Sequence, residues 1–216
     1  MAKYPNDMAV LFDFGGVLMQ QDWDVYDAFG REHGLPKNGL RDALYGTEAW
    51  QNLQTGIGDR EIWARAAIAS LAEHCGERAE EVFALWHGRT PTFHDRNIAL
   101  ANGLRAAGHR IGLLSNAAAD LREALQGRYK LGIKWDDEVI SGLVNLAKPD
   151  EAIFRLAADR IGLPPEGCFF IDDAPRNVEG ARATGMATYH FVGRDYDGLQ
   201  QALSDAGYVW ESGSLT

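Results

Sequence analysis

Apolar and polar positions follow two different periods along this chain, and the change between them divides it into parts. Short apolar runs bounded by turn residues are typical of buried strands, and residues 9–13 form the first of them. Between residues 20 and about 92 the spacing of apolar residues is helical instead, as in the segment that opens at the predicted N-cap Asp59. This stretch contains no convincing strand.

After Pro91 the pattern alternates between strand and helix. Strands separated by helices predict a parallel sheet with helices on both faces. The predicted helices cover residues 97–107, 117–125, 150–161, 176–184 and 196–206, and the predicted strands cover residues 110–115, 138–141, 168–172 and 187–191. We therefore expect an α/β fold in which a parallel-sheet core (residues 1–19 and 93–216) carries an α-helical insert (residues 20–92).

Composition and charge narrow the class of partner. The chain has 216 residues, of which 21 are basic and 31 acidic, and its formal net charge is −10. This balance disfavours a nucleic-acid surface, which needs a basic face, but it allows a small phosphorylated metabolite in a local positive pocket. No apolar run is long enough for a membrane span or a signal segment, and the two cysteines, Cys75 and Cys168, are typical of reduced thiols. We expect a soluble cytoplasmic protein, either a monomer or a homodimer.

Polar residues follow several of the predicted strands. In a parallel sheet the carboxyl ends of the strands lie along one edge, so residues distant in sequence can meet there. A lone strand-end aspartate is often only a turn or cap residue, but several such groups in order make that interpretation weak. The groups in question are Asp13, Ser115-Asn116, Lys148-Pro149 and Asp172-Asp173.

This set suits phosphoryl transfer. Asp13 could attack phosphorus, and Asp13 and Asp173 could hold Mg²⁺, a hard cation that takes oxygen ligands. The Ser115 hydroxyl and the backbone N–H of Asn116 could bind the phosphate oxygens. Lys148 could neutralise the nucleophile and the developing charge.

With these motifs in place, the chain resembles the haloacid dehalogenase superfamily, subfamily I. The resemblance covers nearly the whole length and rests on residues 11–18, residues 113–116, Lys148-Pro149, and residues 170–173 with Asn177 following. It implies a Rossmann-like core with a helical cap, and a Mg²⁺-dependent phosphatase that works through an aspartyl-phosphate on Asp13. It further implies a metal ligand in the backbone carbonyl of Gly15, direct ligation by Asp173, and contact through water by Asp172.

The chain departs from the family pattern at Gly15, where a second aspartate usually protonates the leaving group and activates water. This departure resembles the glucose-1-phosphatase-like branch. Three sources of the proton stay open: a leaving group that needs little help, such as a sugar-1-phosphate; Asp22 or His33 from the insert; or water. For Asp22 a helix N-cap is the stronger interpretation, and for His33 a helix-end charge.

The helical insert is expected to set specificity. Trp50 lies in a glycine-flanked, loop-like segment that could meet the mouth of the site, and the candidate substrate contacts are Glu48, Trp50, Gln51 and Gln54. An aromatic face with amide groups would suit a sugar, but also other organic phosphates. A closing cap would exclude water from Asp13.

Three alternatives stay open. A 2-haloacid dehalogenase would use Asp13 on carbon without a metal, but the pair Asp172-Asp173 would be unfavourable beside its anionic substrate. A phosphonate hydrolase would need an insert lysine for a Schiff base, and Lys37 is the only one. The chain could also be a phosphate-binding module that lost turnover when Gly15 arose.

Overall fold

A five-stranded parallel sheet forms the centre of the structure, a computed structural model that describes residues 7–211. The strands lie in the order β3-β2-β1-β4-β5, and every neighbouring pair is parallel. Their bounds are β1 Ala9–Phe12, β2 Arg110–Ser115, β3 Asp137–Ile140, β4 Cys168–Asp172 and β5 Ala187–His190. The predicted α/β fold with a parallel-sheet core and an α-helical insertion is confirmed.

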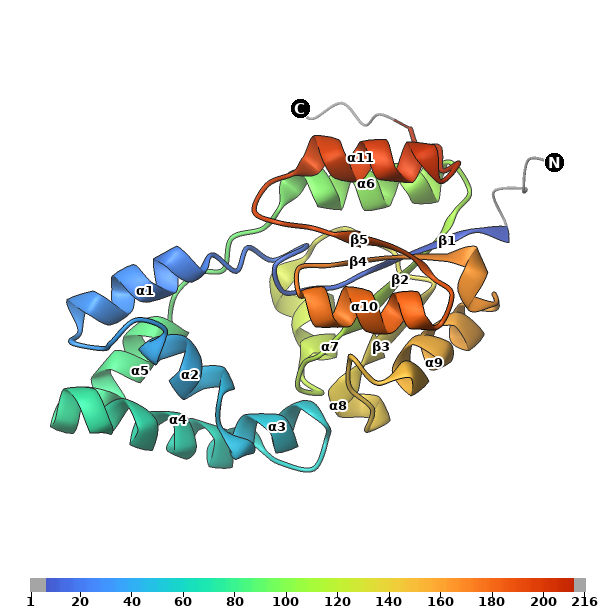
Figure 1. Cartoon of the computed structure of the whole chain (residues 1–216). Helices are drawn as coiled ribbons and strands as arrows, with labels where there is room; N and C mark the ends of the chain where they lie inside the picture. Colours follow the sequence, from blue (N-terminus) through green and yellow to red (C-terminus); the bar gives the residue numbers. More distant parts are fainter. Residues whose placement is uncertain (1–6, 212–216) are drawn as a thin grey trace.

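Helices cover both faces of the sheet (Figure 1). Val10 and Phe12 of the central strand share one apolar cluster with residues of α6 (Asp95–Ala106) and α11 (Tyr196–Asp205). Ala9 and Leu11 belong to a second cluster, with residues of α9 (Glu151–Ile161) and α10 (Pro175–Ala183). Successive side chains of a strand point to opposite faces, so a strand buried on both faces is apolar throughout, as β1 is.

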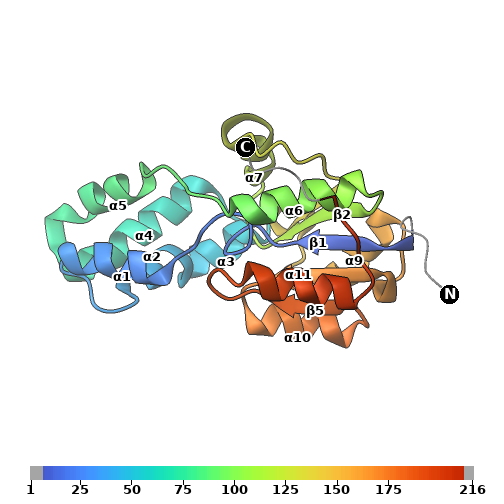
Figure 2. The same cartoon turned by 90° about the horizontal axis from the view of Figure 1, so that it is seen from above.

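Five helices lie between β1 and α6 and form a layer of their own beyond the carboxyl ends of the strands (Figures 1 and 2). They share a third apolar cluster, in which Trp63 and Leu71 are buried. The Trp63 indole N–H donates to the carbonyl of Leu44 at 2.7 Å, so this bulky side chain is both packed and hydrogen-bonded. The helices are α1 Trp23–Glu32, α2 Gly39–Tyr45, α3 Glu48–Gln54, α4 Arg60–Cys75 and α5 Ala79–His87, with a 3-10 turn at Gly76–Arg78.

Two linkers join this helical layer to the sheet, and they pair with each other. The N–H of Gln20 donates to the carbonyl of Thr92 at 2.8 Å, and the N–H of His94 donates to that of Leu18 at 2.8 Å. Because both linkers start at the edge of the sheet that carries Asp13, the helical layer is held over that edge.

The helix predicted over residues 117–125 starts later than expected. Regular helix is confined to α7 (Leu121–Ala124) and continues as a π-helical turn, Leu125–Tyr129. The backbone of Ala117 is occupied elsewhere: its N–H donates to Ser141 Oγ at 2.9 Å, and its carbonyl accepts from the N–H of Gly142 at 3.0 Å. Such non-local bonds replace the helical ones.

Two short helices were not predicted. The segment around Trp50, expected to be loop-like, is the helix α3, because Thr47 caps it by accepting a hydrogen bond from the Trp50 N–H at 3.2 Å. Ser141 belongs to a one-turn helix, α8 (Ser141–Val144), instead of ending the preceding strand. A further 3-10 turn covers Pro165–Gly167. Among residues 7–211, no helix has the length and apolar character that crossing a membrane would require.

Candidate active site

Polar groups at the ends of three neighbouring strands converge on one point of the sheet edge. Asp13 follows β1, Ser115 ends β2, and Asp172 ends β4. Lys148, from the loop before α9, reaches into their midst: its Nζ lies 2.9 Å from Asp13 Oδ1 and 2.6 Å from Asp172 Oδ2. The parallel register therefore brings together side chains that are far apart in sequence.

The Lys148 side chain is fully enclosed. None of it is exposed, and Nζ also donates to the carbonyl of Leu114 at 3.0 Å. Burial alone would lower the pKa of Lys148, but the charges of Asp13 and Asp172 outweigh burial, so its pKa is raised. The ammonium therefore stays charged and fixes two carboxylates by charge-assisted hydrogen bonds.

Asp13 is a buried carboxylate surrounded by like charges. It is 7% exposed, and its Oδ1 also accepts from the Phe14 N–H at 2.7 Å. Burial raises the pKa of Asp13 to about 8; Lys148 opposes this shift, and Asp172 and Asp173 add to it. Burial, followed by the charge of Asp172, likewise raises the pKa of Asp173 to about 6. Ionisation of Asp13 and Asp173 near neutral pH therefore requires positive charge in addition to that of Lys148.

Three carboxylates offer oxygen atoms that all lie within 4.8 Å of one another, those of Asp13, Asp172 and Asp173. A compact oxygen donor set of this kind fits a hard divalent cation such as Mg²⁺. Both oxygens of Asp172 already accept hydrogen bonds: Oδ1 from the Ala174 N–H at 2.8 Å and from Asn177 at 3.0 Å, Oδ2 from Lys148. Asp172 therefore has less acceptor capacity left for a cation than Asp173, whose carboxylate accepts no hydrogen bond from another side chain in the described part of the chain.

Gly16 permits the close approach of Asp173 to the loop after β1. Its φ is 77°, a left-handed conformation that favours glycine. A Cβ at this position would come within 2.4 Å of the Asp173 carboxylate. The absence of a side chain at Gly16 therefore leaves room for the Asp173 carboxylate beside this loop.

Ser115 is the last residue of β2, and Asn116 begins the loop that follows it. The Asn116 side chain forms two hydrogen bonds with the Lys148 backbone, donating to its carbonyl at 2.8 Å and accepting from its N–H at 2.8 Å. It thereby fixes the loop that delivers Lys148. Ser115 is 3% exposed and lines the same cavity as Asp13.

This cavity has a volume of about 350 Å³ and lies between the sheet edge and the helical layer. Its cap side is aromatic, and its rim carries arginines, so cationic groups outnumber carboxylates within it although the whole chain is acidic. Burial, followed by the charges of Arg60 and Arg128, lowers the pKa of His87, which also lines the cavity. The aromatic residues are Tyr45, Trp50, Trp63, Trp86, Phe14 and Tyr129; the cationic residues are Lys148, Arg60, Arg128 and Arg176, and the acidic residues are Asp13 and Asp120.

The predicted contacts from the insert divide into two groups. Trp50 and Gln54 line the cavity, and the Trp50 ring packs edge-on against Tyr45, with 5.1 Å between ring centroids. Gln51 and Glu48 are exposed and do not line it; Gln51 accepts a hydrogen bond from the Gln54 amide. One face of α3 therefore meets the cavity and the other faces solvent.

The two candidate proton donors from the insert lie outside the cavity that contains Asp13. Asp22 is the N-cap of α1 and accepts from the Asp24 N–H at 3.0 Å. His33 is the C-cap of the same helix, and its Nδ1 lies 3.3 Å from a nitrogen of Arg78. The structural interpretation of each residue therefore holds.

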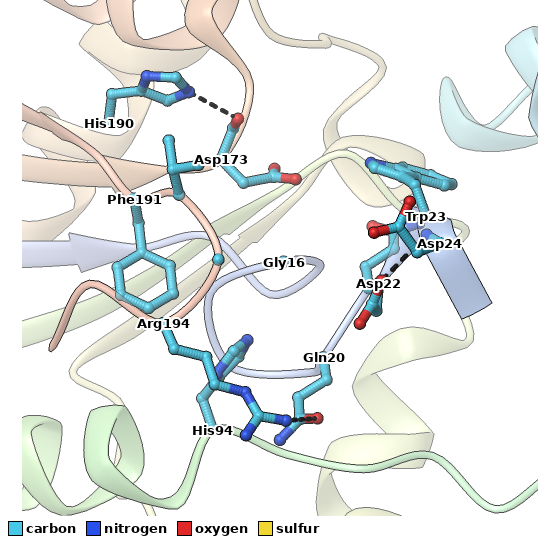
Figure 3. Close-up of a pocket in the computed structure, with 13 residues that line it drawn as sticks. Gly16, Gln20, Asp22, Trp23, Asp24, His94, Asp173, His190, Phe191 and Arg194 are labelled. Atoms are coloured by element: carbon cyan, nitrogen blue, oxygen red, sulfur yellow. Dashed lines mark hydrogen bonds between the residues drawn. The ribbon is translucent and has the colours of Figure 1, made fainter. Parts of the chain in front are cut away.

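A second cavity, of about 520 Å³, lies on the other side of the loop after β1 (Figure 3). Asp173 lines this one, and its carboxylate points into it, beside Gly16 and Trp23. The carboxylate cluster thus stands between two cavities. Asp13 faces the first and Asp173 the second.

Several residues that line the first cavity were not anticipated from the sequence, namely Gln21, Tyr45, Arg60, Arg128 and Arg176. Arg60 forms a two-point ion pair with Asp120, with both nitrogen–oxygen distances at 2.7 Å, and this pair links the helical layer to the sheet domain. Charged and aromatic residues on helices are normally assigned to solvent or to packing, so their sequence pattern carries little signal. The position of Arg176 beside Asn177 was the available hint.

Comparison with known proteins assigns the family. A sequence model of haloacid dehalogenase-like hydrolases matches residues 8–185. Phosphatase MT3486 of Mycobacterium tuberculosis is 30% identical over 213 residues, 93% of this chain and 95% of the relative. Fructose-1-phosphate phosphatase YqaB of Escherichia coli is 30% identical over 201 residues, 85% of this chain and 95% of the relative.

The fold is also similar to that of a solved structure. The crystal structure of an enzyme of this family from Bacteroides thetaiotaomicron, in complex with magnesium and inorganic phosphate, superposes with a TM-score of 0.65. The two sequences are 20% identical, and the match covers 89% of this chain and 98% of the other. The chain belongs to the haloacid dehalogenase-like hydrolase family.

Proposed function

We propose that the protein is a Mg²⁺-dependent phosphatase that removes the phosphoryl group of a small phosphorylated metabolite through an aspartyl-phosphate on Asp13. The observation that carries this proposal is the buried cluster of Asp13, Lys148 and the carboxylates Asp172 and Asp173 at the end of a cavity. A nucleophile, a fixed cation and an oxygen-rich metal site are the parts that phosphoryl transfer requires.

Asp13 and Asp173 would hold the metal, together with the backbone carbonyl of Gly15. When bound, Mg²⁺ would neutralise charge on the phosphoryl oxygens and on the carboxylates. Lys148 orients Asp13 and favours its ionised form, since its Nζ lies 2.9 Å from Oδ1, and the bound cation would supply the further positive charge that ionisation needs. The Ser115 hydroxyl would bind a phosphoryl oxygen, as would the Asn116 backbone N–H at the start of the adjoining loop.

The reaction proceeds in two displacements. A carboxylate oxygen of Asp13 forms a bond to phosphorus while the bond from phosphorus to the leaving oxygen breaks, and the leaving oxygen takes a proton from water. Water then attacks phosphorus, the bond to Asp13 breaks, and inorganic phosphate forms. Because residue 15 is glycine, its side chain supplies no acid to the leaving oxygen, and a leaving group of low pKa is favoured.

The proposed substrates are sugar phosphates, and sugar-1-phosphates in particular. Trp50 and Tyr45 offer apolar ring surface and Gln54 an amide group, a combination that suits a sugar. Two relatives support this class by name, the fructose-1-phosphate phosphatase of E. coli and a phosphorylated carbohydrates phosphatase of Thermotoga maritima, 24% identical over 218 residues. The helices between the two linkers would act as the cap that closes over the substrate.

The test is phosphate release by the purified chain from p-nitrophenyl phosphate and from matched pairs of sugar-1- and sugar-6-phosphates. We expect turnover that disappears with EDTA, returns with Mg²⁺, is lost in Asp13→Asn, and is faster for the 1-phosphates. Binding of phosphate without any turnover would show a phosphate-binding module instead. Metal-independent release of chloride from 2-chloropropionate would show a dehalogenase.

A further inference from the structure

The space beside Gly15 is already filled by another side chain. A Cβ built on Gly15 would lie 2.8 Å from Gln21 Oε1, a contact closer than real Cβ atoms make. Gly15 itself has no left-handed φ, unlike Gly16, so its backbone would accept an ordinary side chain. A side chain at position 15 would therefore require the Gln21 carboxamide to move.

Gln21 lies near two phenols of the helical layer. Burial raises the pKa of Tyr26 on α1 and of Tyr45 on α2, and the polar side chain of Gln21 opposes that rise at both phenols. The two hydroxyl oxygens lie 3.2 Å apart. The amide oxygen is on the side of Gly15, since a Cβ built there would lie 2.8 Å from Oε1 but 3.8 Å from Cδ of Gln21.

This side chain belongs to the reaction cavity. Gln21, Tyr45 and Gly15 line the same cavity as Asp13 and Lys148. Gln21 lies on the first linker, next to Gln20, whose N–H pairs with the second linker. A group on this linker is in place when the helical layer sits over the sheet edge.

We propose that Gln21 is a positioning residue whose amide oxygen stands beside Gly15, in the space that a side chain at that position would enter, and orients the attacking water. This inference rests on the proposed phosphatase function. The water donates a hydrogen bond to Gln21 Oε1 as its oxygen attacks phosphorus; the bond from phosphorus to Asp13 breaks, and the water's proton passes to solvent. An amide accepts no proton, so it orients the water without acting as a base. It equally gives no proton to the leaving group.

This assignment separates the two displacements. Loss of the Gln21 amide should slow hydrolysis of the aspartyl-phosphate and leave the transfer to Asp13 nearly unchanged. A structural role for Gln21 would slow both displacements together, because both use Asp13 in the same cavity. The pre-steady-state time course distinguishes these cases.

The experiment is rapid-mixing release of p-nitrophenol from p-nitrophenyl phosphate with Mg²⁺, for the parent chain, Gln21→Ala and Gln21→Glu. In Gln21→Ala we expect a burst of about one equivalent per site, followed by a steady state slower by on the order of 10–100-fold. Gln21→Glu puts a carboxyl group in the same place, so it should accelerate alkyl phosphates more than p-nitrophenyl phosphate and add a pH dependence. Gln126→Glu, the same change at an exposed position, serves as the control for added charge.

Equal slowing of burst and steady state in Gln21→Ala, or identical selectivity of Gln21→Glu and Gln126→Glu, would overturn the inference. An inactive parent chain would instead overturn the phosphatase proposal, so the two failures differ. The variants Gly15→Asp and Gly15→Asp with Gln21→Ala add a geometric check. The double variant should turn over alkyl phosphates faster than Gly15→Asp alone, because removal of Gln21 frees the space that the carboxylate needs.

Discussion

Replacement of Lys148 by methionine is the most incisive test of the buried charge cluster. The change keeps the unbranched apolar stem of the side chain but removes an ammonium that contacts Asp13 at 2.9 Å, Asp172 at 2.6 Å and the carbonyl of Leu114 at 3.0 Å. The side chain is completely buried in the parent, where bulk water does not screen its charge. Three acceptors, two of them carboxylates, then lose their common partner.

The expected decrease in the free energy of unfolding follows from the burial of the ion pair. Each hydrogen bond to a charged group contributes about 1.5–3 kcal/mol, but the three share one donor and do not add. Removing one partner of a buried ion pair costs about 3–5 kcal/mol, which is the magnitude we expect for Lys148→Met at pH 8. This is a large share of a typical domain stability of about 5–15 kcal/mol. Turnover should fall by at least about 10²-fold.

The decrease in the free energy of unfolding caused by Lys148→Met should be smaller at lower pH. Without Lys148 the native carboxylates bind protons more readily than in the parent, so the stability of the variant falls more steeply as pH rises. The destabilisation at pH 5.5 should therefore be smaller than at pH 8 by at least about 1 kcal/mol.

Urea unfolding in EDTA at both pH values, followed by tryptophan fluorescence and circular dichroism, measures this difference. The exposed substitution Lys134→Met is the matched control and should change stability by less than about 0.5 kcal/mol. A loss for Lys148→Met below 1 kcal/mol at pH 8, or an equal loss at both pH values, would refute the reasoning.

Three further predictions concern the metal site and the cap. In the metal-free protein the pKa values of Asp13 (about 8) and Asp173 (about 6) lie above their ordinary value of 3.8, so the native state binds more protons than the unfolded state. Its melting temperature in EDTA should therefore fall as pH rises from 5.5 to 8, and Mg²⁺ should restore it at pH 8; a rise with pH would contradict this. The side chains of the Arg60–Asp120 pair are about half exposed (46% and 47%), so Arg60→Ala should lower the free energy of unfolding by less than about 1 kcal/mol. The same variant should raise KM, because both residues line the cavity. A double-mutant cycle with Asp120→Ala measures the coupling between the two residues. Trp50→Ala should raise KM on the order of tenfold with little change in kcat, and an unchanged KM would exclude substrate contact by this ring.

The sequence is most informative where backbone and chemistry coincide. Asp13 and Asp172 end apolar strands, and a parallel sheet places such ends on one edge whatever the loops do. Their meeting with Lys148 was therefore predictable from the order of strands, and so was the α/β fold. The helices of the insert other than α3 were predictable as well, because their apolar residues recur at helical spacing.

Prediction failed where non-local bonds decide the local structure, and at one helix where a local cap was overlooked. Ala117 has a helical neighbourhood in sequence, but Ser141 and Gly142 take its backbone groups. The segment around Trp50 was predicted to be loop-like because of its flanking glycines, whereas the Thr47 cap favours a helix there. Arg60 forms its ion pair across the boundary between cap and core, and no periodicity within one helix reveals such a partner.

The role of Gln21 illustrates the same limit at the level of the site. Read alone, Gly15 suggests either a damaged catalyst or a dependence on good leaving groups. In the structure, Gln21 Oε1 lies in the space that a side chain at residue 15 would enter, and Gln21 is six residues further along the same loop. The loop begins at the nucleophile and ends on the linker to the helical layer. Because Gln21 lies on that linker and lines the cavity together with Tyr45 of the helical layer, we expect separation of cap and core to draw the amide away from Asp13. Cap closure would then complete the hydrolytic half of the reaction as well as enclosing the substrate.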